Sequence, residues 1–403
     1  MEVLLSVTET STSPDNITNL TDGIFQPTFY SNRSLNNPPP PPSPTSADEF
    51  LTVLDSAILP VVLILGIVGN ALVVVIFLCS PLKTSGLSHY LVALGVSDFI
   101  YIVSSTVVWV SKPDRIIHLD LERTRGVCQI NTFSLLLSRF LTTWYLFAAH
   151  AERFISHYNV CRARVWCTTF RSKCIILTIF VFSMVGFMHH AWTHVVEDLH
   201  GMKFCMPMPQ SMKFMTELRK VEIISAVFLP AFLIFVCDIA LCVNIISRHL
   251  NNITAHKSRP EAGAGRDCEL KGVYVSTESH RSVCVETLGE EIPLQIYDLE
   301  QEKARTTLTV VVAGVVFIAM VLPASVQQVK SIFSSGKSGF VVPGADERFA
   351  MVVFEDMVKI NSVCKIFIYL VLLRGFRLGF RHICHRMVTR RKSRPANVEE
   401  TNL

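Results

Sequence analysis

The sequence predicts an all-α fold, a seven-transmembrane helix bundle followed by a short amphipathic eighth helix. Half of the 403 residues are hydrophobic and only 17% are charged, which is typical of polytopic membrane proteins and rare in soluble ones. Seven segments also reach the length of about 20 residues that a helix needs to cross a bilayer. Basic residues gather in particular connections between these segments, as they do in membrane proteins with a fixed orientation.

The first 51 residues have the composition of a disordered tail. Ser, Thr, Asn and Pro dominate them, including a PPPPPSP run at residues 38–44, so apolar side chains are too few to form a core. Asn-x-Ser/Thr sequons begin at Asn16, Asn19 and Asn32. They predict N-glycosylation and an extracellular tail, although a tail rich in Asn, Ser and Thr also generates sequons by chance.

The seven predicted spans are joined by short connections, except for a polar loop at residues 247–302 that we expect to be disordered. The spans cover residues 56–78, 87–110, 127–157, 174–192, 223–246, 307–329 and 349–373. The seventh contains four charged residues, so one of its sides must face protein or water instead of lipid. The predicted membrane domain therefore extends over residues 52–386, and residues 387–403 form a carboxy-terminal tail.

The positions of the basic residues predict the orientation. Four of them lie between the third and fourth spans, and eight follow the seventh, whereas the amino-terminal tail holds only Arg33. Loops rich in Lys and Arg stay in the cytoplasm. We therefore expect a multi-pass plasma-membrane protein with an extracellular amino terminus.

The segment after the seventh span has the pattern of a helix that lies on a membrane surface. Phe376, Phe380 and Ile383 recur at helical spacing in RGFRLGFRHICHRM, with arginines between them. Such a basic amphipathic helix binds membrane lipid through its apolar face. Cys384 lies in it and is a candidate for palmitoylation.

Short motifs occupy defined places in the first three spans. GNALVVV contains Asn70, LVALGVSDF contains Asp98, and AERFISHY contains Glu152 and Arg153. In this order and spacing the chain resembles rhodopsin-like (class A) G-protein-coupled receptors over residues 52–386. The resemblance implies a membrane receptor, not an enzyme, that needs no cofactor and engages a heterotrimeric G-protein through Glu152 and Arg153.

The resemblance also implies a disulfide between Cys128, where the third span begins, and Cys205, before the fifth. An extracellular location allows such a bond to form. Pro230 and Pro323 stand at the family's kinks of the fifth and sixth spans, and Phe317 lies six residues before Pro323.

Several positions depart from the family pattern. Val321 replaces the tryptophan of the sixth span, and Phe180 replaces that of the fourth. Asp238 stands in place of a tyrosine in the fifth span. The N-P-x-x-Y motif reads KIFIY, with Lys365 and Ile366 in place of the asparagine and proline. These changes remove parts of the usual activation relay.

Lys365 is the most unusual of these residues, because an ammonium at membrane depth costs about 3 kcal/mol or more. Asn361, Lys365 and Tyr369 recur at i, i+4 and i+8 and form one polar stripe on the seventh helix. In the family this stripe and Asn70 belong to the polar core that faces the carboxylate of the second span, here Asp98, and sodium commonly binds between them. We predict that the Lys365 ammonium replaces the sodium and pairs with Asp98. The alternative is that it snorkels to the membrane surface.

A second group of charges lies nearer the predicted extracellular side, where ligands of the family bind. It comprises Arg139, Glu355, Asp356 and Lys359. Arg139 is suited to hold a carboxylate or an amide oxygen of a peptide, and Leu135 replaces the aspartate of amine receptors. These residues either bind a ligand or neutralise one another as an internal network, and the sequence leaves both open. We identify no metal-ligand pattern.

The class of ligand is less strongly indicated. NVCRARVWCTTFRSKC, after the third span, resembles the second inner loop of FMRFamide-type neuropeptide receptors, which implies a peptide ligand. One alternative is an opsin, because Lys359 occupies the offset of the retinal-binding lysine. Others are a binding-only decoy receptor and, in a different class, a transporter, although no internal repeat supports the last.

Overall fold

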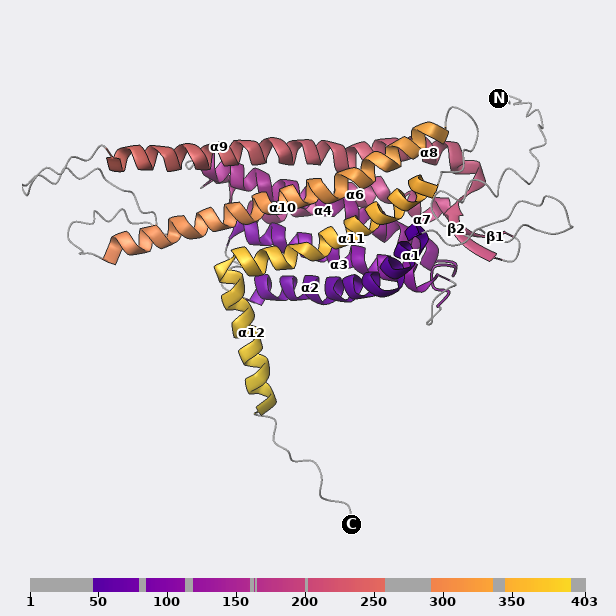
Figure 1. The fold of residues 1–403 in the computed structure, drawn as a ribbon, viewed down its shortest axis with the longest axis horizontal. Coiled ribbons are helices and arrows are strands. Elements are labelled where there is room, and N and C mark those ends of the chain that lie inside the picture. The colour runs from indigo at the N-terminus through magenta and orange to yellow at the C-terminus, as the bar shows by residue number, and fades with distance from the viewer. Residues whose placement is uncertain are drawn as a thin grey trace, which may run out of the picture.

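The computed structural model of the chain describes residues 46–79, 85–112, 119–159, 163, 165–199, 202–257, 291–335 and 345–392. Figure 1 shows most of these residues in long helices that lie side by side, with a small hairpin at one end of the bundle. The sequons at Asn16, Asn19 and Asn32 lie outside the described residues.

The described chain contains seven long helical rods. Three of them are composed of or continued by short pieces: α1, η3 and α2 form the first rod, α7 follows α6 at the end of the fourth, and α8, η6 and α9 form the fifth. The elements are α1 (Ser46–Val53), η3 (Leu54–Ile58), α2 (Leu59–Cys79), α3 (Gly86–Val110), α4 (Val127–Tyr158), α6 (Thr169–Phe187), α7 (His190–Thr193), β1 (His194–Leu199), β2 (Met202–Pro207), η5 (Pro209–Ser211), α8 (Met212–Ile223), η6 (Ile224–Phe228), α9 (Leu229–Lys257), α10 (Glu291–Ser335), α11 (Ala345–Leu372) and α12 (Arg374–Lys392).

The rods enclose one core. Helix α3 packs on α2, α4 and α6, and α4 packs on α9. Helix α10 packs on α9 and α11, and α11 packs on α2, which closes the ring. Fully buried apolar side chains come from different rods and meet along the axis; they include Ile76, Ile102, Leu146, Ile234 and Phe317.

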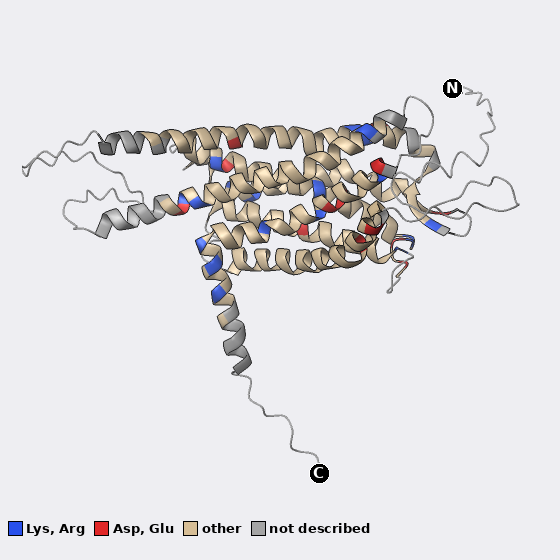
Figure 2. Cartoon of the chain, in the orientation of Figure 1, with Lys and Arg blue, Asp and Glu red and all other residues tan. Residues whose placement is uncertain are grey.

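Five of the described helices are long and apolar enough to cross a membrane by themselves; they lie at Glu49–Cys79, Gly86–Val110, Thr169–Thr193, Phe214–Ser247 and Gln301–Lys330. The third and seventh rods, α4 and α11, complete the bundle but carry more polar residues. Figure 2 shows charged positions in the middle of the bundle. Of those on α11, Asp356 and Lys365 are only 5% and 2% exposed. Helix α11 therefore turns these charges inward, away from lipid.

The helices extend further than the hydrophobic runs predicted. Residues 46–51, expected in the tail, are helical. Helix α9 extends into the predicted loop as far as Lys257, and α10 begins within that loop, at Glu291. The expected carboxy-terminal tail likewise begins within α12, which ends at Lys392. Once a helix has nucleated, each further residue adds one hydrogen bond, so helices continue beyond the apolar segment until a residue stops them.

A two-stranded antiparallel hairpin departs from the all-helical expectation. Strands β1 and β2 pair from His194 opposite Pro207 to Leu199 opposite Met202. We call the end of the bundle that bears this hairpin the hairpin end, and the opposite end the α12 end (Figure 1).

Helix α12 leaves the bundle at a steep angle, with basic residues, all arginines, in its first turns (Figures 1 and 2). Its Phe376 ring is fully buried and lies 5.4 Å from the ring of Phe77 and 5.9 Å from that of Tyr369, measured between centroids. Arg377 donates hydrogen bonds from Nη1 to the carbonyl oxygens of Leu370 and Val371. These contacts fix the start of the eighth helix against α2 and the last turn of α11.

We expect Phe376→Ala to destabilise the protein by about 3–5 kcal/mol, because it removes a fully buried ring from between two others. The thermal unfolding temperature of the purified protein in detergent measures the effect. Leu378→Ala is the control, since Leu378 lies on the same helix with 55% of its surface exposed. Equal shifts in the two variants would show that α12 is not anchored by Phe376.

Candidate functional site

An ion pair lies at the centre of the bundle. The Lys365 Nζ atom on α11 is 2.7 Å from Oδ2 of Asp98 on α3. The Lys365 side chain is 2% exposed and that of Asp98 is fully buried. The ammonium thus points across the bundle to the carboxylate and does not snorkel to the membrane surface.

Polar groups from two other helices surround this pair. Thr142 on α4 donates a hydrogen bond from Oγ1 to Oδ1 of Asp98 at 3.0 Å. Asn70 on α2 donates from Nδ2 to the carbonyl oxygens of Gly66 at 2.9 Å and Ser362 at 3.3 Å. Each oxygen of the Asp98 carboxylate therefore has a partner, and the polar core connects α2, α3, α4 and α11.

Asn361 and Tyr369, the other members of the predicted stripe, are buried on the same helix, at 2% and 1% exposure. In the part of the chain that the structure describes, Asn361 Oδ1 and the Tyr369 hydroxyl have no hydrogen-bond partner. The stripe thus faces the interior over about two turns of α11, with Lys365 in its middle.

The second group of predicted charges forms two ion pairs. Arg139 Nη1 lies 3.7 Å from Glu355 Oε1, too far for a hydrogen bond. Lys359 Nζ lies 2.7 Å from Asp356 Oδ1 and donates to it. Lys359 therefore pairs with Asp356, three residues before it, and not with Glu355, four residues before it. In the structure these four residues neutralise one another in pairs.

A cavity lies between the ion pair and the hairpin end. Its empty volume, including the open mouth, is about 610 Å³, and its wall comes from α3, α4, α6, α8, η6, α10 and α11. Arg139 is the member of the second charge group that lines it. At its inner limit the lining includes Thr142 and Ser362, which bond to Asp98 and Asn70. A molecule bound in the cavity would therefore touch Thr142, which bonds to Asp98 of the central ion pair, and Ser362, which belongs to the surrounding polar core.

Two charged residues of the cavity wall, Arg219 and Glu222, were not predicted. The hydrophobic run of the fifth span begins at Ile223, so the predicted span left both residues outside the bundle. In the structure they are on α8, which continues directly into the membrane rod. The sequence signal that could have identified Arg219 and Glu222 was their position in the turn just before the apolar run.

Glu222 is the centre of a cluster at the hairpin end. Its Oε1 atom lies 2.7 Å from His190 Nε2 and 3.1 Å from His189 Nε2, and its Oε2 atom lies 3.6 Å from Arg219 Nη1. His194 packs beside His190, with ring centroids 5.4 Å apart. Burial, and then the proximity of His190, lowers the pKa of His194 to about 4, so this imidazole is neutral at physiological pH.

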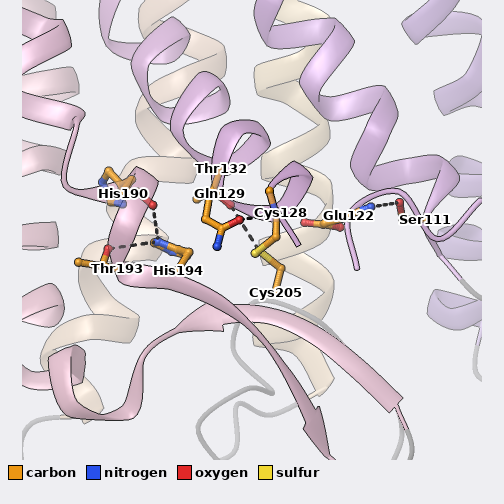
Figure 3. Close-up of a disulfide and its surroundings, with 10 residues drawn as sticks. Ser111, Glu122, Cys128, Gln129, Thr132, His190, Thr193, His194 and Cys205 are labelled. Carbon is orange, nitrogen blue, oxygen red and sulfur yellow. Dashed lines mark hydrogen bonds between the residues drawn. A yellow bond between two sulfur atoms is a disulfide. The ribbon is translucent and has the colours of Figure 1, made fainter. Parts of the chain in front are cut away.

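The predicted disulfide between Cys128 and Cys205 is present and connects the start of α4 to β2 (Figure 3). The nearby connection between α3 and α4 is fixed by a hydrogen bond from the Glu122 backbone N–H to Ser111 Oγ at 3.0 Å. Burial raises the pKa of the Glu122 carboxyl to about 7, against a smaller lowering effect of Arg123. The disulfide anchors the hairpin over the mouth of the helix bundle.

At the α12 end, the predicted coupling residues lie between α4 and α10. Arg153 Nη2 is 3.4 Å from Glu152 Oε1, and its Nη1 donates to Thr306 Oγ1 at 3.4 Å. One turn further, the Lys303 ammonium donates to the carbonyl oxygen of Ser156 at 3.2 Å. These contacts hold the two helices together at this end. Cys384 lies in α12, but its side chain is outside the described part of the chain.

Asp238, which replaces a tyrosine of the family pattern, pairs with a histidine. Its Oδ1 atom lies 3.2 Å from His150 Nε2, and the His150 side chain is fully buried. Gly314 on α10 makes room for both groups, because a Cβ atom there would lie 2.5 Å from His150 Nε2 and 2.6 Å from Asp238 Oδ2. Asp238 thus provides a carboxylate where the family has a tyrosine hydroxyl, and this carboxylate makes a polar contact between α9 and α4.

We expect Lys365→Met to lower the free energy of unfolding by about 3–5 kcal/mol, because it leaves the buried Asp98 carboxylate without its cation. Asp98→Asn in the same chain should restore most of this loss, which a double-mutant cycle of unfolding free energies measures. Lys220 and Glu217, 2.6 Å apart with side chains 27% and 71% exposed, form the control pair. Their coupling should stay below about 1 kcal/mol. Equal coupling in the two pairs would contradict a buried, interdependent ion pair.

Comparison with known proteins agrees with this geometry. The model of the family described as 7 transmembrane receptor (rhodopsin family) matches residues 69–373. That range is more than half of the chain and extends from Gly69 in the first rod to the residue after α11. No curated protein gives a sequence match. The chain therefore belongs to the rhodopsin family of seven-transmembrane receptors.

Proposed function

We propose that this chain is a plasma-membrane receptor that binds a peptide at the hairpin end and activates a heterotrimeric G-protein at the α12 end. One observation carries the proposal: the cavity begins at the hairpin end and extends to Thr142 and Ser362, the neighbours of the central ion pair. A ligand can shift a conformational equilibrium only through contacts that differ between the two states. A cavity that reaches a charged contact between helices supplies such contacts.

The charges of the wall favour a peptide. Arg139 and Arg219 offer guanidinium groups, and Glu222 offers a carboxylate. A peptide presents a carboxylate or amide oxygen and an amine, which match these groups. Because Arg139 is 3.7 Å from Glu355 and makes no hydrogen bond to it, a ligand carboxylate gains from a direct bond to this guanidinium.

The hairpin end is the extracellular side in this proposal. The disulfide lies there, and disulfides persist in oxidising compartments. The basic residues after the seventh span follow α11 at the opposite end (Figure 2), where cytoplasmic Lys and Arg belong. The amino-terminal sequons would then face the lumen of the secretory pathway and be glycosylated.

At the α12 end, the contacts of Arg153 with Thr306 and of Lys303 with Ser156 keep α10 close to α4. Opening this end to admit a G-protein requires these contacts to break. Peptide binding near the ion pair would favour the open state, with Arg153 released to contact the G-protein. Lipid attachment at Cys384 would hold α12 on the membrane.

A binding-only decoy is the second candidate, and two specific observations favour it. The Lys365 ammonium bonds α11 to α3 where the family has a mobile sodium, and Val321 lines the cavity in place of the tryptophan. Both changes oppose the usual movement of the sixth and seventh helices. An opsin is less well supported, since Lys359 is not among the residues that line the described cavity.

We expect a neuropeptide library to contain an agonist of the wild-type receptor in a cellular G-protein activation assay. Arg139→Gln should reduce its potency at least tenfold, because a charge-assisted hydrogen bond is worth about 1.5–3 kcal/mol. Arg123→Gln is the control, since Arg123 pairs with Asp120 in the connection before α4 and should keep wild-type potency.

Cell-surface labelling must show equal amounts of each variant. Binding of a peptide without G-protein activation would identify a decoy. No peptide binding by receptor shown to be at the surface, or equal potency of the two arginine variants, would contradict the proposed ligand site.

A further inference from the structure

We propose that His189, His190 and Glu222 form a binding site for a divalent transition-metal ion, best matched by zinc, at the hairpin end. One potential ligand atom from each residue lies within 4.8 Å of the other two. Two imidazole nitrogens and one carboxylate oxygen are a common ligand set for zinc with one open coordination position.

The spacing of the three atoms fits a metal ion. Zinc binds nitrogen and oxygen at about 2.0–2.2 Å, so two ligand atoms on a tetrahedral ion lie about 3.3 Å apart. The two contacts to Glu222 Oε1 measure 2.7 Å from His190 Nε2 and 3.1 Å from His189 Nε2. These separations are about 0.6 Å and 0.2 Å below the tetrahedral value, and one potential ligand atom of each histidine lies within 4.8 Å of the other, so small rotations of the side chains would bring all three ligand atoms to one ion.

The second ring nitrogen of His189 sets its tautomer. His189 Nδ1 lies 2.9 Å from the carbonyl oxygen of Gly186, so Nδ1 carries the proton and donates it. In the neutral ring Nε2 then has a lone pair, and this lone pair faces the Glu222 carboxylate. Metal-binding histidines are typically oriented by such a bond from the other ring nitrogen.

Hydrogen bonding alone accounts for both histidines only if His189 is protonated at both ring nitrogens. His190 can donate a hydrogen bond from Nε2 to Glu222 at 2.7 Å, which joins the end of the fourth rod to α8. His189 Nε2 has no hydrogen-bond partner in the described part of the chain. A lone pair 3.1 Å from a carboxylate oxygen is repulsive unless a proton or a cation lies between them. A metal ion satisfies both nitrogens and the oxygen at once.

The surroundings are compatible with an ion that enters from the cavity. His190 and Glu222 are nearly buried, the His189 side chain is 14% exposed, and Glu222 lines the cavity wall. Arg219 competes as a cation, but it contacts Oε2 at 3.6 Å and leaves Oε1 to the histidines. With its side chain 32% exposed, Arg219 can turn toward solvent when the ion binds. His194 packs on His190, near the disulfide (Figure 3), and fixes its ring.

A zinc titration tests the site. The untagged, purified full-length protein in lipid nanodiscs competes for zinc with a fluorescent chelator, and the competition gives the zinc affinity. We expect wild type to bind one zinc ion at this site and His189→Asn to bind it at least tenfold more weakly, because it loses one ligand. His382→Asn is the control. It changes an exposed histidine on α12, close to His385 and Cys384, and should leave this affinity unchanged.

Zinc X-ray absorption of the loaded wild type should show two imidazoles and no sulfur in the first coordination shell. That measurement decides the question even if His189→Asn fails to fold. Absence of zinc binding, equal affinity of wild type and His189→Asn, or coordination that includes sulfur would overturn the proposal. None of these readouts depends on a peptide ligand, so the metal site can fail or stand independently of the proposed receptor function.

Discussion

The ion pair between Asp98 and Lys365 is the interaction on which the rest of the site depends. A bilayer offers no water to either charge, so each must be matched inside the protein. The 2.7 Å contact between them fixes the rotation of α11 relative to α3, and with it the inward direction of Asn361 and Tyr369. Thr142 adds α4 to the same assembly. The polar core therefore sets how three central helices face one another, even though a buried ion pair need not add net stability.

Charge is distributed along the bundle in layers, and the cavity lies between two of them. Toward the hairpin end, Arg139, Arg219 and Glu222 line the wall, while Thr142 and Ser362 mark the limit near the ion pair. A bound molecule would thus exchange polar contacts with the wall and disturb the central layer at the same time. The third layer, around Arg153 and Lys303, holds α4 to α10 at the α12 end. In the proposed receptor, signalling consists of changes in these contacts.

Hydrophobic runs predicted the membrane helices well, because burial in lipid imposes a simple pattern on the sequence. The Lys365–Asp98 contact was also predictable, since an ammonium at that depth needs a partner and the stripe on α11 points one way. Pairings between charged side chains of similar length were harder to predict: Lys359 pairs with Asp356 and not with Glu355. The hairpin and the cluster of His189, His190 and Glu222 were not predicted. They depend on how the ends of the fourth and fifth rods approach one another, which local periodicity does not record.

We propose that the Lys365 ammonium, paired with Asp98, occupies the place of the family's sodium ion, and the sodium dependence of stability tests this proposal. The thermal unfolding temperature of the purified receptor is measured in sodium chloride and in choline chloride at equal ionic strength, for wild type and for Lys365→Asn. We expect no sodium-specific change in wild type and stabilisation by sodium in Lys365→Asn, where Asp98 regains a free cation site. Sodium-specific stabilisation of the wild type would contradict it, because the site would then be open to a free ion.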